Sequence, residues 1–289
     1  MEIFHRFAIG AHFSEQFRAV GVDLPESKDL ILVFEIAEDD PRWRDVERLA
    51  KDIGNGGAGH TLTTKFSRSE LDAAAYLSML PSWHHGYPQP EDEFAYRKAT
   101  YDLSDYCPVC GIGARQVAPF RFKKPPSWGR RSILQLNWVF DEYFVKPEIW
   151  ESVFRPYGAE CRPVVLDKTG AEIESVVQLE IPNLVELQMG DYPFEECSTC
   201  GRKKFDPRVA GFSQLPASTA SNIFKSTQYF GSGASAFRHV LVSNALYGKF
   251  HLVQARGVEF QPCGPVTLVG GMVVAVAPAI SAASQRTNN

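Results

Sequence analysis

The sequence lacks an excess of charge of either sign. Its 289 residues include 30 lysines and arginines and 34 aspartates and glutamates, which gives a net charge of −4. Proteins dedicated to nucleic acid usually carry a basic excess that neutralises phosphates, so nucleic acid is not an expected partner. The basic run Arg121-Phe122-Lys123-Lys124, with Arg130-Arg131 after it, is interpreted as a solvated loop. The mild acidity permits a basic protein partner without requiring one.

Targeting and membrane-spanning signals are also missing. Residues 1–6 contain no basic stretch that leads into an apolar core, so no secretory signal is expected. Residues 265–283 are uncharged, but they contain two glycines, two prolines and many alanines. We interpret them as a short strand, Val266–Val269, followed by a loose tail, rather than as a membrane span. We therefore expect a cytoplasmic protein of bacterial type that has no membrane partner.

Disorder, internal repeats and long polar linkers are absent as well. Hydrophobic residues make up 44% and aromatic residues 12% of the chain, whereas disordered chains are poor in both. No repeat of solenoid length is found. We expect an α+β fold with mixed sheets, divided into an N-terminal α/β region, 1–95, and a region 96–289 that holds the cysteine pairs. Because no linker separates the two regions, they can also form one compact domain.

Hydrophobic patterning predicts the main elements. Runs of branched apolar residues predict strands, and apolar residues three to four positions apart predict helices. A helix at 70–79 is expected to begin after a serine cap, Ser67 or Ser69, and to end before Pro81. The other expected elements are strands at 29–36, 60–66, 172–180 and 183–188, a strand leading into a turn or helix within 132–145, helices at 41–53 and 147–154, and a closing hairpin at 250–253 and 258–260.

Cysteine is scarce, and its placement is the most specific feature of the sequence. Four of the six cysteines form two Cys-x-x-Cys-Gly segments, Cys107-Pro108-Val109-Cys110-Gly111 and Cys197-Ser198-Thr199-Cys200-Gly201. Two cysteines three residues apart on a tight turn can offer both thiolates to one zinc ion, and the glycine supplies the backbone angles that close the turn. Two such knuckles complete a tetrahedral site. The predicted zinc ligands are Cys107, Cys110, Cys197 and Cys200.

The distance between the two knuckles in sequence bears on their architecture. They are separated by 86 residues, 111–196, whereas a compact zinc ribbon has about 15–20 between its pairs. We expect either a large insertion between two ribbon halves or knuckles at the edges of a larger sheet. A redox dithiol, an iron–sulfur centre and knuckles that bind nothing are the alternatives. Cys161 and Cys263 lie apart from the pairs and are interpreted as small buried hydrophobic residues.

No motif in the sequence indicates an enzyme. A site of four cysteines leaves zinc no open coordination position, which favours a structural role over catalysis. The segment Gly231-Ser232-Gly233-Ala234-Ser235 lacks the lysine of a phosphate-binding loop and is interpreted as a turn. The neighbours His84 and His85 are interpreted as part of a surface loop or as histidines whose hydrogen bonds are satisfied. Asp141 and Glu142 are expected to face opposite sides of a strand and therefore not to share a pocket.

The two knuckles, widely spaced in a chain of this size, resemble those of the bacterial double-CxxCG motif proteins. A C-terminal pattern resembles the end of the same family: Asn222-Ile223-Phe224, Tyr229-Phe230-Gly231, Val240-Leu241-Val242-Ser243 and Gly257-Val258-Glu259-Phe260-Gln261-Pro262. The resemblance implies an immunity protein that neutralises a cognate toxin in competition between neighbouring cells. The four cysteines match the shared motif. The resemblance identifies no toxin-contact residue and does not extend to residues 1–95.

Three functions of different classes are consistent with these features. The leading hypothesis is a zinc-stabilised immunity protein that binds a cognate protein toxin. An enzyme that uses His84 and His85, or Asp141 and Glu142, would need a deep pocket holding several of those side chains. The alternative is a nucleic-acid-binding zinc-ribbon protein, which predicts a basic face near the knuckles formed by Arg115, Arg121, Lys123, Lys124, Arg202, Lys203 and Lys204.

Overall fold

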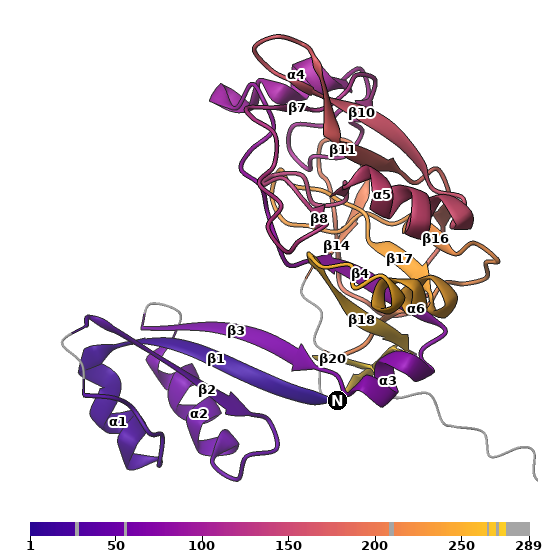
Figure 1. Ribbon diagram of the computed structural model, residues 1–289. Helices are drawn as coiled ribbons and strands as arrows, with labels where there is room; N and C mark the ends of the chain where they lie inside the picture. The colour runs from indigo at the N-terminus through magenta and orange to yellow at the C-terminus, as the bar shows by residue number, and fades with distance from the viewer. Residues whose placement is uncertain (27–28, 55–56, 208–210, 265, 270–271, 276–289) are drawn as a thin grey trace, which may run out of the picture. The chain divides into compact units, whose positions relative to one another are not determined.

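The chain is divided into two units, Met1–Glu70 and Leu71–Asn289. The computed structural model describes residues 1–26, 29–54, 57–207, 211–264, 266–269 and 272–275. The fold is α+β, which confirms the expected class, and its strands belong to several separate sheets (Figure 1). The boundary expected at residue 95 falls inside the second unit, because β4 (Tyr76–Pro81) lies within the largest sheet of that unit.

The first unit is a three-stranded antiparallel sheet with two helices on one face. Along β1, His5, Phe7 and Ile9 are buried, whereas Arg6 and Ala8 between them are exposed, because successive side chains of a strand point to opposite faces. The expected strands at 29–36 and 60–66 and the helix at 41–53 are confirmed within one to two residues at most ends. The elements are β1 (Glu2–Gly10), η1 (Ala11–Phe13), α1 (Ser14–Ala19), β2 (Ile31–Ala37), α2 (Trp43–Ile53) and β3 (Ala58–Lys65), and the sheet order is β2-β1-β3.

The helix expected at 70–79 is shorter than the sequence indicates. It forms α3 (Arg68–Ala73), and Ser67 and Glu70 cap its start: the Ser67 N–H donates to the Glu70 carboxylate at 2.8 Å. The residues that follow form β4, which pairs with β17 (Val240–Ser243) on one side and β18 (Val258–Gly264) on the other. Hydrogen bonding along both edges of β4 outweighs the helical pattern of this segment.

The second unit contains a six-stranded sheet in the order β12-β16-β17-β4-β18-β15. The expected hairpin at 250–253 and 258–260 is wrong in its first half, because α6 (Asn244–Leu252) occupies it. The Ser243 hydroxyl caps this helix by accepting from the Leu246 N–H at 3.3 Å, and burial of the Leu246 and Phe250 side chains holds the helix on the core. The remaining strands of the sheet are β12 (Leu184–Val185), β15 (Ser213–Gln214) and β16 (Ile223–Ser226).

A five-stranded sheet in the order β7-β10-β11-β9-β8 shares a buried hydrophobic cluster with the six-stranded sheet. Val145 and Leu179 from this sheet and Leu77 and Val242 from the six-stranded sheet belong to one buried cluster. The strand expected at 172–180 is confirmed as β11 (Glu172–Glu180). The other elements are β7 (Arg121–Phe122), β8 (Ile133–Leu134), β9 (Phe144–Val145), β10 (Glu160–Leu166), α5 (Pro147–Ile149), the π-helix η3 (Trp150–Phe154) and η4 (Arg155–Tyr157).

Short hairpins complete the second unit. The strand expected at Val266–Val269 is confirmed as β19, which pairs with β20 (Met272–Ala275), and the expected tail beyond residue 275 lies outside the described residues. Within the described ranges, no helix is long and apolar enough to cross a membrane. The other small elements are η2 (Asp92–Phe94), α4 (Tyr96–Thr100), the pair β5 (Tyr101–Asp102) and β6 (Arg115–Gln116), and the pair β13 (Phe194–Glu196) and β14 (Lys203–Phe205).

Candidate metal centre

Each cysteine pair lies in the loop of an antiparallel hairpin. Cys107 and Cys110 lie between β5 and β6, and Cys197 and Cys200 lie between β13 and β14. The five-stranded sheet is formed by residues between the two hairpins, which accounts for the long separation of the knuckles in sequence. The arrangement is therefore that of two zinc-ribbon halves with a large insertion between them.

The two knuckles share one backbone geometry. In each, the N–H of the glycine donates to the carbonyl of the first cysteine at 2.8 Å, and the N–H of the first cysteine donates to the carbonyl of the residue after the glycine at 2.9 Å. Both glycines have the positive φ that side-chain-bearing residues rarely adopt, +82° at Gly111 and +70° at Gly201. The sequence motif thus folds the same way twice, and it aims both thiols of each pair to one side of the turn.

The four sulfur atoms meet at one point. The distance from Cys107 Sγ to Cys197 Sγ is 3.8 Å and that from Cys110 Sγ to Cys200 Sγ is 3.6 Å, and all four Sγ atoms lie within 4.8 Å of one another. Four thiolates around zinc at about 2.3 Å would be separated by about 3.8 Å, the edge of the tetrahedron. The donor atoms and their spacing therefore fit a tetrahedral metal ion of this size.

Backbone N–H groups lower the thiol pKa of the first cysteine in each knuckle. The N–H groups of Cys200 and Thr199 donate to the Cys197 sulfur and lower the pKa of this thiol to about 6. The N–H of Cys110 acts in the same way on Cys107 and lowers the pKa of that thiol. A lowered pKa raises the fraction of thiolate, which is the form that binds metal.

Two basic side chains from the second hairpin tie the knuckles together. The Arg202 guanidinium donates to the carbonyls of Asp105 at 2.8 Å and Ile112 at 3.1 Å, on either side of the first knuckle. The Lys204 ammonium is buried and donates to the Cys110 carbonyl at 3.0 Å. These contacts hold the two cysteine pairs at one distance and place positive charge close to the thiols.

Gly111 and Gly201 allow a matched test of this packing. A Cβ on Gly111 would overlap the backbone carbonyl of Ala234, whereas a Cβ on Gly201 would meet nothing within 4 Å. Both alanine variants share the backbone strain, about 1–2 kcal/mol each. We expect Gly111→Ala to lower the free energy of unfolding by roughly 1–3 kcal/mol more than Gly201→Ala, because of the overlap. Urea unfolding of the two variants measures the difference, and equal losses would show that the close approach to Ala234 is unimportant.

The two remaining cysteines do not join the cluster. Cys263 is 3% exposed and packs with Leu187, Phe224 and Leu241, as expected of a small hydrophobic residue. Cys161 lies half-buried on β10. Among the described residues, the four knuckle cysteines form the one group of three or more metal-ligating side chains close enough to share an ion.

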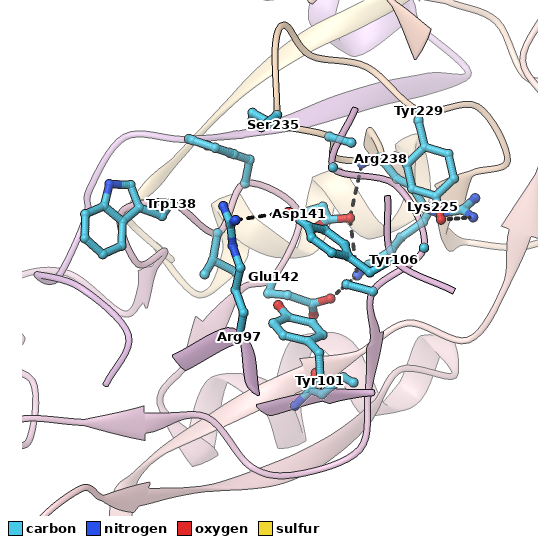
Figure 2. Close-up of a pocket in the computed structure, with 18 of the residues that line it drawn as sticks. Arg97, Tyr101, Tyr106, Trp138, Asp141, Glu142, Lys225, Tyr229, Ser235 and Arg238 are labelled. Carbon is cyan, nitrogen blue, oxygen red and sulfur yellow. Dashed lines mark hydrogen bonds and ion pairs between the residues drawn. The ribbon is translucent and has the colours of Figure 1, made fainter. Parts of the chain in front are cut away.

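Asp141 and Glu142 lie together, contrary to the expectation that they would not share a pocket. They belong to an irregular bend before β9 rather than to a strand, so neighbouring side chains can point the same way. Both line a cleft of about 230 Å³ next to the first knuckle (Figure 2). The Lys225 Nζ atom is 2.5 Å from Glu142 Oε1 and 4.0 Å from Asp141 Oδ2. The sequence around Asp141 and Glu142 does not indicate this ion pair, because Lys225 belongs to β16, far away in the chain.

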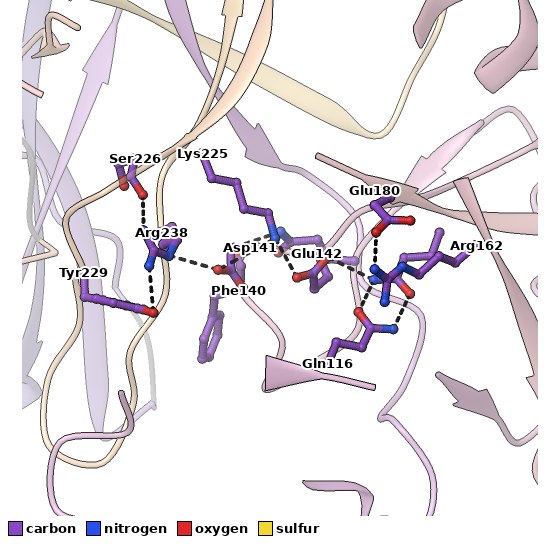
Figure 3. A network of polar contacts seen from close by, with 12 residues as sticks. Gln116, Phe140, Asp141, Glu142, Arg162, Glu180, Lys225, Ser226, Tyr229 and Arg238 are labelled. Carbon is purple, nitrogen blue, oxygen red and sulfur yellow. Dashed lines mark hydrogen bonds and ion pairs between the residues drawn. The ribbon is translucent and has the colours of Figure 1, made fainter. Parts of the chain in front are cut away.

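The Glu142–Lys225 pair belongs to a longer polar network (Figure 3). The Gln178 amide donates to Glu142 Oε2 at 3.0 Å, and Gln178 and Gln116 exchange two amide hydrogen bonds of 2.7 and 2.8 Å. Burial raises the pKa of Glu142, and the Lys225 ammonium opposes this shift. The network links β6 of the first hairpin to β11 and β16, so it helps to fix the hairpin on the two sheets.

His84 and His85 lie elsewhere, in a second cleft with Lys123, Lys124 and Arg131. A ring nitrogen of His85, Nε2, lies 3.4 Å from the Lys124 carbonyl, and burial lowers the pKa of this histidine. In the part of the chain that the structure describes, neither histidine joins a metal-ligating cluster.

Most of the basic residues near the knuckles have partners within the chain. Lys123 and Lys124 line the histidine cleft instead. The contacts of the other five are Arg115 with Asp102, Arg121 with Asp167, Arg202 with Asp105, Lys203 with the Phe194 ring, and Lys204 with backbone carbonyls.

Comparison with known proteins adds no relative to this picture. No protein-family model matches the chain, and no curated protein matches it with significant similarity. The four-cysteine centre is therefore supported by its own geometry: two hairpins of the same backbone form that bring four thiols to tetrahedral spacing.

Proposed function

We propose that Cys107, Cys110, Cys197 and Cys200 bind one zinc ion, and that the ion stabilises the fold rather than taking part in catalysis. The observation that carries this is the meeting of four thiols at the spacing of a zinc tetrahedron. Four protein thiolates fill the coordination of a tetrahedral ion and leave no position for substrate or water. We assign no enzymatic role to this centre.

The two hairpins that carry the cysteines are short, and a bound zinc ion would stabilise them. The strands of the first hairpin have two residues each and those of the second have three. Two-stranded hairpins of this kind are marginal in water without further packing. Zinc binding joins the two into one unit and contributes folding free energy directly. The walls of the adjacent cleft, which include Tyr106, Gly111 and Tyr229, would then be held by the same ion.

The function we propose for the whole chain is that of an immunity protein, which binds and neutralises a protein toxin. Three features support it: the resemblance of the two Cys-x-x-Cys-Gly segments to the double-CxxCG motif, the closed four-thiol centre, and a net charge of −4 that suits a basic partner. The nucleic-acid-binding alternative has less support, because Arg115, Arg202 and Lys204 are engaged within the chain.

Co-expression tests the immunity proposal. Cells that produce the toxin encoded beside this chain's gene are expected to survive when they also produce the wild-type chain. A variant with Cys107→Ser is expected to lose protection together with its zinc, whereas Cys161→Ser, outside the cluster, is expected to protect as the wild type does. Death of cells that contain a soluble, zinc-loaded wild-type chain would refute the proposal.

A further inference from the structure

Arg97 lines the cleft of Figure 2, and the side chains that contact its guanidinium group, Tyr106, Phe94 and Tyr96, are uncharged. It projects from α4, and its Nη1 donates to the Tyr106 hydroxyl at 3.0 Å. Its guanidinium carbon lies 4.7 Å from the centre of the Phe94 ring. Among the described residues, no carboxylate lies within 4.0 Å of it. A guanidinium carries five N–H donors in a planar fork, so most of them remain for a ligand.

The carboxylates of the cleft are already engaged. Glu142 contacts Lys225, and Asp141 accepts a hydrogen bond from the backbone N–H of Arg238 at 3.1 Å. The cleft is lined by three cations, Arg97, Lys225 and Arg238, and by these two carboxylates. It therefore has a net charge of +1 and one guanidinium with donors to spare, which is complementary to a single negative charge.

Trp138 and Phe140 line the cleft, and two further aromatic rings, those of Tyr87 and Phe94, pack on the Trp138 ring. The Trp138 ring centre lies 4.3 Å from that of Tyr87 and 4.5 Å from that of Phe94. Tyr87, Phe94 and Phe140 each expose more than 40% of their surface. Trp138 and Phe94 adopt φ values of +67° and +57°. Such backbone strain persists where the surrounding structure holds it, often at binding sites.

We propose that the cleft receives an acidic side chain, aspartate or glutamate, of a protein partner, with its carboxylate on Arg97 and these aromatic rings packed around it. Arginine and tryptophan beside tyrosine are the residues that dominate binding at protein interfaces. A volume of about 230 Å³ is below the roughly 300–1,000 Å³ of small-molecule sites, which favours one inserted side chain over a free ligand of drug size. The assignment of a protein as the partner rests on the proposed function; the affinity for a carboxylate does not.

Blocked amino acids test the carboxylate site without the partner. N-acetyl-glutamate N-methylamide and its neutral isostere, N-acetyl-glutamine N-methylamide, would be titrated into the full zinc-loaded chain. The readouts are the NMR signals of the Trp138 indole N–H, assigned with Trp138→Phe, and of the Arg97 Nε–H. The glutamate probe is expected to shift both signals with half-saturation on the order of 1–10 mM. The glutamine probe is expected to leave both unchanged.

Variants separate a specific site from general charge. Arg97→Gln is expected to lower the affinity for the glutamate probe at least tenfold. Arg97→Lys is expected to have an affinity between those of the wild type and Arg97→Gln, because lysine keeps the charge but lacks the planar fork of donors. Arg131→Gln, in the histidine cleft, is expected to bind as the wild type does. Circular dichroism and zinc content establish that each variant is folded.

Four results would overturn the inference: no shift with the glutamate probe, equal shifts with both probes, unchanged binding by Arg97→Gln, or tighter binding of inorganic phosphate than of the glutamate probe at equal ionic strength. The last would make the site one for phosphate. A chain that protects cells but does not bind the glutamate probe would contradict this inference and leave immunity intact. A chain that binds the probe but neutralises no toxin would contradict the proposed function alone.

Discussion

Replacement of Cys107 by serine is expected to abolish zinc retention and to lower the free energy of unfolding by several kcal/mol. Cys107 is 5% exposed and its sulfur lies 3.8 Å from that of Cys197, so its loss removes a thiolate that joins the two hairpins. Structural zinc contributes roughly 10–16 kcal/mol in zinc-finger peptides. Part of the fold is expected to remain, because Arg202 and Lys204 still connect the knuckles. Urea unfolding with and without a chelator measures the loss.

Cys161→Ser is the matched control for this experiment. Cys161 is half-buried on β10 and lies outside the four-thiol cluster. The substitution Cys161→Ser removes a thiol that does not belong to the four-cysteine cluster. We therefore expect full zinc content and a loss in the free energy of unfolding of about 1 kcal/mol or less. Addition of a chelator should destabilise the wild type and Cys161→Ser alike and leave Cys107→Ser unaffected. A wild-type chain whose unfolding is insensitive to the chelator would contradict a structural role for zinc.

Replacement of Lys225 by methionine is expected to cost about 3–5 kcal/mol, because it leaves a buried carboxylate without its cation. The Lys225 side chain is 11% exposed, and Glu142, at 2.5 Å from it, is 15% exposed. Lys146→Met is the control, since the Lys146–Glu148 pair is wider, at 3.8 Å, and its Glu148 side chain is 68% exposed. An exposed pair of this kind contributes about 0–1 kcal/mol. Urea unfolding compares the two variants.

The pH dependence of Lys225→Met identifies the cause. Burial already raises the pKa of Glu142 above 4.5, and loss of the ammonium raises it further. A carboxyl whose pKa is higher in the folded than in the unfolded chain destabilises the fold as pH rises past the unfolded value. The deficit should therefore be larger at pH 8 than at pH 5. Adding Glu142→Gln should recover most of it at pH 8; a deficit independent of pH and of this second change would point to lost packing instead.

The four-cysteine cluster was predictable because each of its two segments carries the information locally. A Cys-x-x-Cys-Gly segment determines its own turn, and the positive φ of Gly111 and Gly201 and the repeated hydrogen bonds show that the turn forms as the motif indicates. We expected the two pairs to meet because four thiolates are a common ligand set for one tetrahedral zinc ion. Long strands with strong patterns, such as β11 (Glu172–Glu180), were predictable for the same reason.

Other features depend on distant partners and were not predictable. Residues 76–81 became a central strand because β17 and β18 flank them, which no local pattern reveals. Asp141 and Glu142 share a pocket because an irregular bend replaces the expected strand and Lys225 arrives from β16. Arg97 lies on α4, and the cleft that it lines is formed by four segments that are far apart in sequence. The net charge of the cleft could not be predicted from the sequence, because its charged residues come from separate segments of the chain.

The central claim is one zinc ion bound by four thiolates. The most direct measurement is X-ray absorption at the zinc edge, with metal analysis, on the wild-type chain purified without chelator. We predict one zinc per chain and a first coordination shell of four sulfur atoms at about 2.3 Å. A folded chain that contains no zinc, or a first shell in which nitrogen or oxygen replaces sulfur, would contradict it.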